Sequence, residues 1–323
     1  MENLFYEDKE IPGIHHVTAI AGDPQRNVDF YTGLLGLRLV KLTVNFDDPG
    51  TYHLYYGDEA GRPGTILTFF PWPGARRGRR GNGQVATVSF SIPQGAMGYW
   101  QAQLKRHGVA TGQPKSRFDE EALAFSDPDG LLLELVAHPA AESHAPWQEG
   151  PLPAARAIRG LHSVTLWSSH ERTAALLAET LGFRPLPDAA GRSRFAATPD
   201  GPGALVDVIH RPDGEPGSGG AGTVHHVAWR TPDGAQQLAW RQTIGEQGLH
   251  VTPVMDRRYF HSIYFREPGG VLFEIATDPP GFTLDEPQAQ LGTQLKLPPW
   301  LESRRAGIEQ RLPPLDLPGK RVA

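Results

Sequence analysis

Hydrophobic and polar residues follow the same order four times along the chain. Each copy opens with a short run that has the composition of a β-strand, and it continues into a stretch with apolar residues at roughly helical spacing. The opening runs are residues 13–18, 84–89, 160–165 and 223–228. The helical stretches are residues 24–35, 97–108, 170–181 and 234–248. This internal repeat decides the predicted fold.

Each copy ends with a further short apolar run that starts at a glycine. These closing runs are residues 64–69, 130–135, 203–208 and 270–275. We interpret each copy as a β-α-β-β-β unit, and two such units commonly curl into one cup. The sequence therefore predicts an α+β fold in which four β-α-β-β-β repeats form two cup-shaped half-barrel pairs.

Segments without either periodicity suggest the domain boundaries. Residues 140–156 are rich in proline and alanine, which is typical of a linker. We predict an N-terminal domain of two repeats over 1–139, a linker over 140–156, a C-terminal domain of two repeats over 157–280 and a tail over 281–323. The glycine-rich residues 213–222 predict a mobile loop, and residues 299–310 predict one short helix in a tail to which no chemistry is assigned.

Composition and charge narrow the chemistry. The 323 residues are 39% hydrophobic, enough for a folded core, and contain no cysteine, so a metal would need nitrogen and oxygen ligands. The net charge of -5 argues against general nucleic-acid binding, and we interpret the basic residues 75–81 as a solvated loop. No apolar run approaches about 18 residues, and no basic-then-apolar signal opens the chain. We expect a cytoplasmic protein with neither nucleic-acid nor membrane partners.

Strand register indicates which side chains can meet. Because side chains alternate between the two faces of a strand, equivalent positions of the repeats face equivalent directions. The position before the central valine of the opening runs is occupied by His16, Thr87, Ser163 and His226. The fifth position of the closing runs is occupied by Thr68, Glu134, Asp207 and Glu274.

Only the first and last repeats together offer two imidazoles and a single carboxylate. Their set is His16, His226 and Glu274, with Thr68 as a non-ligand, whereas every other pairing that we considered supplies at most one histidine. Two histidines and one carboxylate leave positions open on Fe(II) for substrate and dioxygen. We therefore predict a metal site between these repeats and a second, metal-free cup, in which Glu134 is a salt-bridged or rim residue.

Two predictions concern the histidines that do not belong to this set. His162 should not be a ligand, because serine occupies the metal-facing position of its strand and parity turns His162 to the other face. His15 and His225 should also point away from the ligand face unless the strands bulge. Each of these two either packs in the wall or orients a ligand and exchanges protons with a substrate.

Three further residues are candidates for contact with a substrate. Thr18 shares the face of His16 and could donate a hydrogen bond to a substrate oxygen. Arg257 and Tyr264 lie shortly before Glu274, although a tyrosine at such a position is usually an amphipathic core residue.

The paired His-His strands, the four repeats and the run Pro-Gly-Gly-Val-Leu-Phe-Glu at 268–274 resemble the vicinal oxygen chelate superfamily, which includes glyoxalases, bleomycin resistance proteins and extradiol dioxygenases. More narrowly, the chain resembles ring-cleaving dioxygenases that open hydroquinones. The similarity extends from about residue 14 into the tail and includes residues 52–56, 63–65 and 281–286.

The resemblance implies a metal-dependent enzyme with Fe(II), or alternatively Mn(II), held by His16, His226 and Glu274. It implies a small aromatic diol of the hydroquinone or catechol type and O2 as substrates, and a ring-opened product. The pocket residues that it implies are His15, Thr18, His225, Arg257 and Tyr264. In this scheme His225 exchanges the proton, and Arg257 and Tyr264 stabilise developing oxyanion charge.

Two other functions remain open at this point. A glyoxalase-like isomerase or lyase normally needs a fuller metal shell, whereas Thr68 occupies the fourth ligand position. A non-catalytic small-molecule binding protein, as among drug-sequestering members of the superfamily, needs no metal triad. The sequence leaves a homo-oligomeric state open, because superfamily membership alone determines neither reaction nor assembly.

Overall fold

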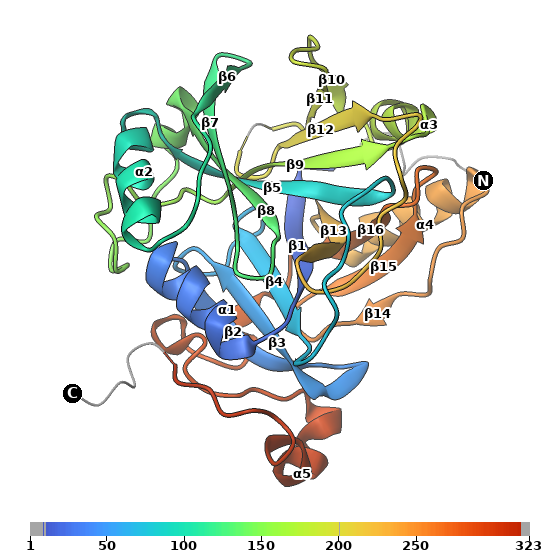
Figure 1. Ribbon diagram of the computed structural model, residues 1–323. Helices are drawn as coiled ribbons and strands as arrows, with labels where there is room; N and C mark the ends of the chain where they lie inside the picture. Colours follow the sequence, from blue (N-terminus) through green and yellow to red (C-terminus); the bar gives the residue numbers. More distant parts are fainter. Residues whose placement is uncertain (1–8, 10, 200, 318–323) are drawn as a thin grey trace.

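The computed structural model describes residues 9, 11–199 and 201–317, and it contains the four predicted repeats (Figure 1). The ends of the predicted first domain and tail, residues 1–8 and 318–323, lie outside the described residues. The first repeat consists of β1 (Ile14–Ala21), α1 (Pro24–Val28), η1 (Asp29–Leu34), β2 (Arg38–Asn45), β3 (Asp48–Gly57) and β4 (Ile66–Pro71). The second consists of β5 (Gln84–Pro93), η2 (Gln94–Ala96), α2 (Met97–Arg106), β6 (Lys115–Arg117), β7 (Glu120–Ser126) and β8 (Leu132–His138).

The other two repeats have the same order of elements. After η3 (Pro139–Ser143), the third repeat consists of β9 (Leu161–Ser168), α3 (Arg172–Ala175), η4 (Leu176–Thr180), β10 (Arg184–Pro185), β11 (Ser193–Ala196) and β12 (Leu205–His210). The fourth consists of β13 (Thr223–Thr231), α4 (Gly234–Glu246), β14 (Met255–Asp256), β15 (His261–Arg266) and β16 (Leu272–Thr277). The β-α-β-β-β unit and the α+β fold predicted from the sequence are therefore confirmed.

Each half of the chain contributes one repeat to each of two eight-stranded sheets. The first sheet has the order β14-β15-β16-β13-β1-β4-β3-β2, and the second has the order β10-β11-β12-β9-β5-β8-β7-β6. β1 pairs antiparallel with β13, and β5 pairs antiparallel with β9. The first repeat thus shares a sheet with the fourth, which is the pairing that the ligand register required. The predicted domain boundaries stay a prediction.

All four opening strands bulge at the same position. In the pairing of β1 with β13 the register shifts at His15 and at His225, and in the pairing of β5 with β9 it shifts at Ala86 and at His162. A bulge places two residues opposite one and re-aims a side chain that simple alternation would turn away. The strands therefore bulge at His15 and His225, which is the condition under which these side chains need not point away from the ligand face.

The glycine-rich residues 213–222 form backbone hydrogen bonds with residues 76–82, and the predicted mobility of this loop stays a prediction. The Ala221 carbonyl accepts a hydrogen bond from Gly78 N at 3.0 Å, and the Ser218 carbonyl accepts one from Arg79 N at 2.9 Å. A Cβ atom on Gly220 would lie 2.5 Å from the Arg76 carbonyl oxygen, so glycine permits this close backbone approach. The arginines of residues 75–81 are exposed, as the interpretation of a solvated segment predicts.

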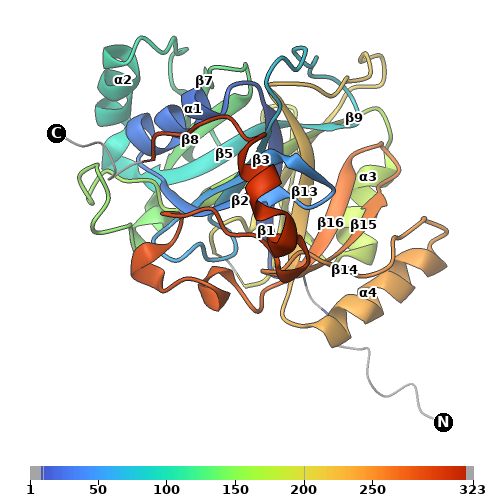
Figure 2. The same ribbon diagram turned by 90° about the horizontal axis from the view of Figure 1, so that it is seen from below.

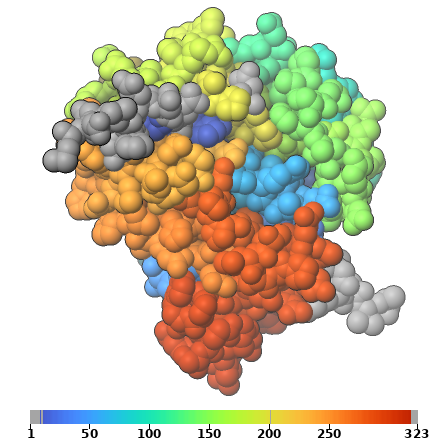
Figure 3. All heavy atoms as spheres, turned by 180° about the vertical axis from the view of Figure 1, so that it is seen from behind, coloured from blue at the N-terminus to red at the C-terminus, as the bar shows by residue number. Residues whose placement is uncertain are grey.

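The tail packs against the first repeat. It contains η5 (Phe282–Leu284), η6 (Gln288–Gln290), η7 (Pro299–Arg304) and α5 (Arg305–Glu309), and the last two form the helix predicted over 299–310. Seen from below, the tail crosses the sheet near β2 and β3 (Figure 2), and from behind it forms one end of the molecule (Figure 3). The fully buried ammonium of Lys41 pairs with Asp285 and Glu286, which ties the tail to β2. Within the described residues no helix is both long and apolar enough to span a membrane.

In the second cup, arginines pair with the two carboxylates whose positions correspond to that of Glu274. Arg117 forms a buried ion pair with Glu134, and Arg194 donates from Nε to Asp207 Oδ1 at 2.7 Å. Arg192 lies between the two carboxylates, 4.0 Å from Glu134 and 3.5 Å from Asp207. These pairs neutralise the buried carboxylates, so the prediction that Glu134 is salt-bridged is confirmed.

Glu120 extends this network to His162, whose Nε2 lies 2.9 Å from the Glu120 carboxylate. Burial opposes ionisation of Glu120, but His162 and Arg194 outweigh it and lower the pKa of the carboxyl from 4.5 to about 2. His162 is therefore a partner of Glu120 and lies in the sheet that lacks His16 and His226.

We predict that Glu120→Gln lowers the free energy of unfolding by about 2–3 kcal/mol at pH 7. A depressed carboxyl pKa stabilises the fold above the usual pKa of about 4.5 and loses this effect as the pH falls through about 2. Urea unfolding should thus show the difference from wild type shrinking by about half at pH 3. The exposed neighbour Glu121 supplies the control Glu121→Gln. A deficit that does not change between the two pH values would contradict this assignment.

Candidate metal centre and aromatic pocket

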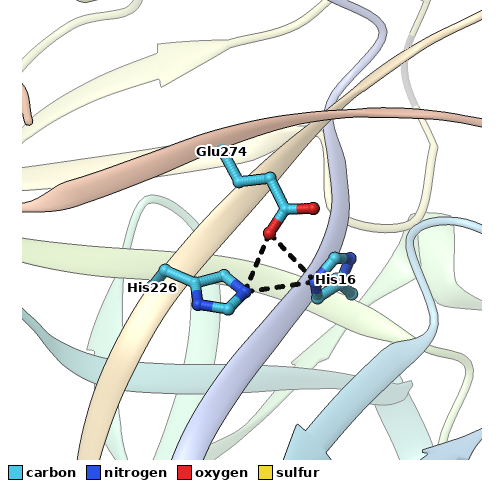
Figure 4. Close-up of side chains that lie close together, drawn as sticks. All are labelled: His16, His226 and Glu274. Atoms are coloured by element: carbon cyan, nitrogen blue, oxygen red, sulfur yellow. Dashed lines mark hydrogen bonds and ion pairs between the residues drawn. The ribbon is translucent and has the colours of Figure 1, made fainter. Parts of the chain in front are cut away.

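Three potential metal ligands converge where β1, β13 and β16 lie side by side (Figure 4). His16 Nε2 lies 3.3 Å from His226 Nε2 and 3.6 Å from Glu274 Oε2, and His226 Nε2 lies 2.9 Å from the same carboxylate oxygen. All three side chains are buried. They come from residues 16, 226 and 274, so the fold of the whole chain creates this cluster.

The arrangement fits a cation. Two ring nitrogens and a carboxylate oxygen direct their electron density into one small volume, with all ligand atoms within 4.8 Å of one another. Glu274 Oε2 is buried and has no hydrogen-bond partner among the described residues. A buried, unpartnered carboxylate oxygen is costly unless a positive charge balances it. Two imidazoles and one carboxylate are the donor set of the facial triad of non-haem iron enzymes.

Each candidate ligand side chain is held by a neighbour outside the cluster through an atom that does not face the other two. His15 Nδ1 lies 2.9 Å from His16 Nδ1, and His225 Nδ1 lies 2.8 Å from His226 Nδ1. Ser262 Oγ donates to Glu274 Oε1 at 2.5 Å. When a histidine binds a metal through Nε2, its proton resides on Nδ1 and needs an acceptor. The bulges at His15 and His225 bring such an acceptor to each candidate ligand.

The protonation states of Glu274 and His226 favour the binding of a cation. Burial disfavours the ionised form of Glu274, but His16 and His226 outweigh it and hold the pKa of this carboxyl well below its usual range. Burial lowers the pKa of His226 although Glu274 opposes that effect. The carboxylate is thus ionised and the His226 imidazole neutral near pH 7, and these are the protonation states that bind metal.

A cavity of about 320 Å³ opens onto the cluster. This volume lies at the lower end of ordinary small-ligand pockets, which measure roughly 300–1,000 Å³. The aromatic residues that line it are Phe46, Tyr55, Phe70, Trp72, Phe260 and Tyr264. Aromatic walls with the ligand cluster at one side suit a flat ring that carries an oxygen toward a metal.

Three of the predicted pocket residues line this cavity, namely His225, Arg257 and Tyr264. Arg257 Nε donates to the Tyr264 hydroxyl at 3.1 Å, and Arg257 Nη1 pairs with Asp47 Oδ2 at 2.9 Å. Burial, followed by the charge of Glu274, raises the pKa of Tyr264. The phenol therefore stays protonated beside a permanent cation.

His15 and Thr18 are not among the residues that line the cavity. The His15 ring packs on Phe260 with centroids 5.0 Å apart, and burial lowers the pKa of His15 well below its usual value. The Thr18 hydroxyl is fully buried and lies 2.9 Å from Thr68 Oγ1. The structure thus brings His15 to the back of a candidate ligand and places Thr18 beside Thr68, which occupies the fourth position of the register.

Register analysis missed His53, Tyr55 and Phe260, which all line the cavity. Phe260 packs on the His16 ring with centroids 5.0 Å apart. His53 and Tyr55 lie on β3, the third strand of the first repeat, whereas the register comparison used only opening and closing strands. The histidine within the alternating run at residues 52–56 was the available signal.

Residues 13–135 and 161–275 match the family described as the Glyoxalase/Bleomycin resistance protein/Dioxygenase superfamily. The Bacillus subtilis (strain 168) protein named "Putative ring-cleaving dioxygenase MhqO" is 49% identical over 96% of this chain and 98% of its own length. The chlorohydroquinone/hydroquinone 1,2-dioxygenase of Sphingobium indicum is 36% identical over 91% of this chain and 94% of its own length.

Solved structures agree with this relationship. A Bacillus subtilis crystal structure titled "putative dioxygenase" superposes with a TM-score of 0.92 at 48% identity, over 96% of this chain and 99% of that one. A glyoxalase I mutant from Zea mays superposes with a TM-score of 0.61 at 17% identity, over 82% of this chain and 92% of that one. The second likeness concerns the fold alone.

We predict that His226→Ala and Glu274→Ala each weaken the binding of a divalent metal by more than the roughly 10–100-fold that loss of an outer partner costs. Each variant removes one of only three converging donors. His162→Ala is the matched control, because this residue occupies the same repeat position as His15 and His225 but pairs with Glu120. Metal analysis after anaerobic reconstitution and desalting measures the effect. Equal metal loss in His162→Ala would overturn the assignment.

Proposed function

Because the chain belongs to the Glyoxalase/Bleomycin resistance protein/Dioxygenase superfamily, we propose that it is a metal-dependent ring-cleaving dioxygenase, an oxidoreductase that inserts O2 into a hydroquinone- or catechol-type diol. The similarity to MhqO and to the hydroquinone dioxygenase supports this reaction class. One observation carries the proposal, namely the convergence of His16, His226 and Glu274 beside an aromatic-lined cavity.

Fe(II), with Mn(II) as the alternative, is the cofactor that we propose for these three ligands. Such a metal, when bound, brings the diol and O2 together and allows electron density to pass from the ring to oxygen. Two imidazoles and one carboxylate leave open coordination positions, which this chemistry needs.

The side chains around the cavity would bind and orient the diol. The aromatic walls contact the faces of the ring and exclude water. Arg257 carries a positive charge, and Tyr264 keeps its proton because burial raises the pKa of the phenol. These two groups are hydrogen-bonded to each other, so their donors are already in place when negative charge develops on a substrate oxygen.

His225 is the group that we propose to exchange protons with the substrate. Its side chain lines the cavity and is exposed, whereas the imidazole of its neighbour His226 is buried. Desolvation, followed by the neighbouring His226, lowers the pKa of His225 from 6.5 to about 3, so the neutral ring would accept a proton from the diol and release it to solvent while its Nδ1 stays next to His226. His15 makes the corresponding contact with His16 from a buried position, so we propose an orienting role for it.

The two alternative functions receive less support. A glyoxalase-like isomerase or lyase would use a fourth ligand, but the Thr68 hydroxyl is already engaged by Thr18 and His53. A non-catalytic drug-binding protein would not need a buried cluster of three converging ligand atoms. The cytoplasmic location and the homo-oligomeric state stay predictions.

We predict that His225→Gln retains the metal but lowers turnover by about a hundredfold or more, the scale expected for loss of a general acid–base group. Oxygen uptake with hydroquinone and catechol, measured beside metal content, separates the two effects. The ligand variant Glu274→Ala is the comparison, because it should lose metal and activity together. If wild-type protein binds iron yet consumes no oxygen with any diol, and isomerises a hemithioacetal instead, the isomerase function replaces this proposal.

A further inference from the structure

A chain of four hydrogen-bonded side chains runs from β3 to the ligand cluster. The Tyr55 hydroxyl lies 2.9 Å from His53 Nδ1, and His53 Nε2 lies 2.8 Å from Thr68 Oγ1. Thr68 Oγ1 in turn lies 2.9 Å from Thr18 Oγ1. Tyr55, Thr68 and Thr18 are each at most 1% exposed. Burial of polar groups at this level is costly unless they serve one another as partners.

The Thr18 end of the chain lies next to the candidate ligands. Thr18 pairs with His226 across β1 and β13 and with Thr68 across β1 and β4. It also lies two residues beyond His16 on the same strand, so parity gives it the ligand face. Thr68 occupies in the first repeat the register position that Glu274 occupies in the fourth. The hydrogen-bonded series therefore reaches the position from which a fourth ligand would contact the metal.

The protons carried by Tyr55 and His53 determine which group donates in each of these hydrogen bonds. The His53 imidazole is neutral, because burial and then the neighbouring His16 and His226 lower its pKa well below the usual value. A neutral imidazole carries one N–H and one acceptor nitrogen. The Tyr55 hydroxyl has His53 Nδ1 as its hydrogen-bond partner among the described residues. Since an imidazole nitrogen is a better acceptor than a phenol oxygen, Tyr55 donates and the His53 proton resides on Nε2.

The remaining hydroxyl protons can then follow the hydrogen-bonded series toward Thr18. His53 Nε2–H donates to Thr68 Oγ1, which leaves the proton of Thr68 available for its other partner, Thr18 Oγ1. Thr18 accepts that hydrogen bond and keeps its own proton for a group outside the chain. Were the imidazole proton on Nδ1 instead, Thr68 would donate to His53, Thr18 would donate to Thr68, and Thr18 would offer only lone pairs to the site.

We propose that Tyr55 and His53 are positioning residues that act through Thr68 to hold the Thr18 hydroxyl as a hydrogen-bond donor toward the ligand cluster. This inference rests on the proposed function: the Thr18 hydroxyl does not line the cavity, so it would donate to an anionic oxygen bound at the ligand cluster itself. The same arrangement occupies the Thr68 hydroxyl with two hydrogen bonds and keeps this residue from acting as a fourth ligand.

The first test determines which ring nitrogen of His53 carries the proton, and it does not require an activity assay. Nitrogen-15 spectra of histidine-labelled, metal-free protein distinguish a protonated ring nitrogen from an unprotonated one. His53 should carry its proton on Nε2 in the wild type. In Tyr55→Phe, which removes only the hydroxyl, the preference for Nε2 should weaken or reverse. A wild-type His53 protonated on Nδ1 would overturn the proposal, whatever the reaction proves to be.

The second test separates the hydrogen bond from packing. Thr68→Val keeps the shape of threonine but removes the hydroxyl that links His53 to Thr18, whereas Thr68→Ser retains a hydroxyl. We expect Thr68→Val to lower kcat about tenfold or more with wild-type metal content, which is less than the roughly 100–1,000-fold cost of deleting an oxyanion donor outright. Thr68→Ser should retain most of the activity. Equal losses in both variants would point to packing and contradict the proposal.

A matched control exists in the second cup. Thr165 is the register equivalent of Thr18 and is fully buried, and its hydroxyl accepts from Arg192 Nη1 at 2.8 Å. Thr165→Val should destabilise the protein and leave kcat unchanged. Introducing Tyr55→Phe into Thr68→Val should produce no further loss of kcat, since Tyr55 acts through Thr68. Additive losses of kcat in the double variant would contradict the proposal that Tyr55 acts through Thr68. If wild type consumes no oxygen with any diol, the proposed reaction fails while the tautomer result still stands.

Discussion

The convergence of His16, His226 and Glu274 in one buried volume depends on the pairing of the first and last repeats in a single sheet. Three groups with lone pairs approach within 4.8 Å of one another, and one carboxylate oxygen there has no hydrogen-bond partner among the described residues. Such a cluster is unfavourable without a positive charge at its centre. Two of the candidate ligands lie 210 residues apart on β1 and β13, so the pairing of the first and last repeats also creates the candidate site.

The two cups show two ways to satisfy the same register position. In the second sheet, Arg117 and Arg194 neutralise Glu134 and Asp207. In the first sheet no arginine pairs with the Glu274 carboxylate among the described residues, and imidazoles surround it instead. The repeated scaffold therefore supports either a salt-bridged core or a cation site. Guanidinium groups occupy the second cup, whereas the first cup retains a cavity beside the candidate cation site.

The sequence predicted the repeats, their pairing and the three candidate ligands, because alternation along a strand and repetition of the unit both leave a readable register. It could not decide the facing of His15 and His225, since a bulge adds one residue and reverses parity locally. It also missed His53 and Tyr55, whose place beside Thr68 depends on how β3 and β4 pair. The burial of Lys41 against Asp285 and Glu286 depends on contacts between residues more than 240 positions apart, which no local pattern indicates.

Anomalous X-ray scattering at the iron edge, from crystals of anaerobically iron-loaded protein, would show whether the cluster binds iron. One iron peak per chain is expected at bonding distance, about 2 Å, from His16 Nε2, His226 Nε2 and Glu274 Oε2. Data collected at the manganese edge would show which metal the site prefers. A peak coordinated by Glu134 or Asp207, or no peak at the His16, His226 and Glu274 cluster, would contradict the account.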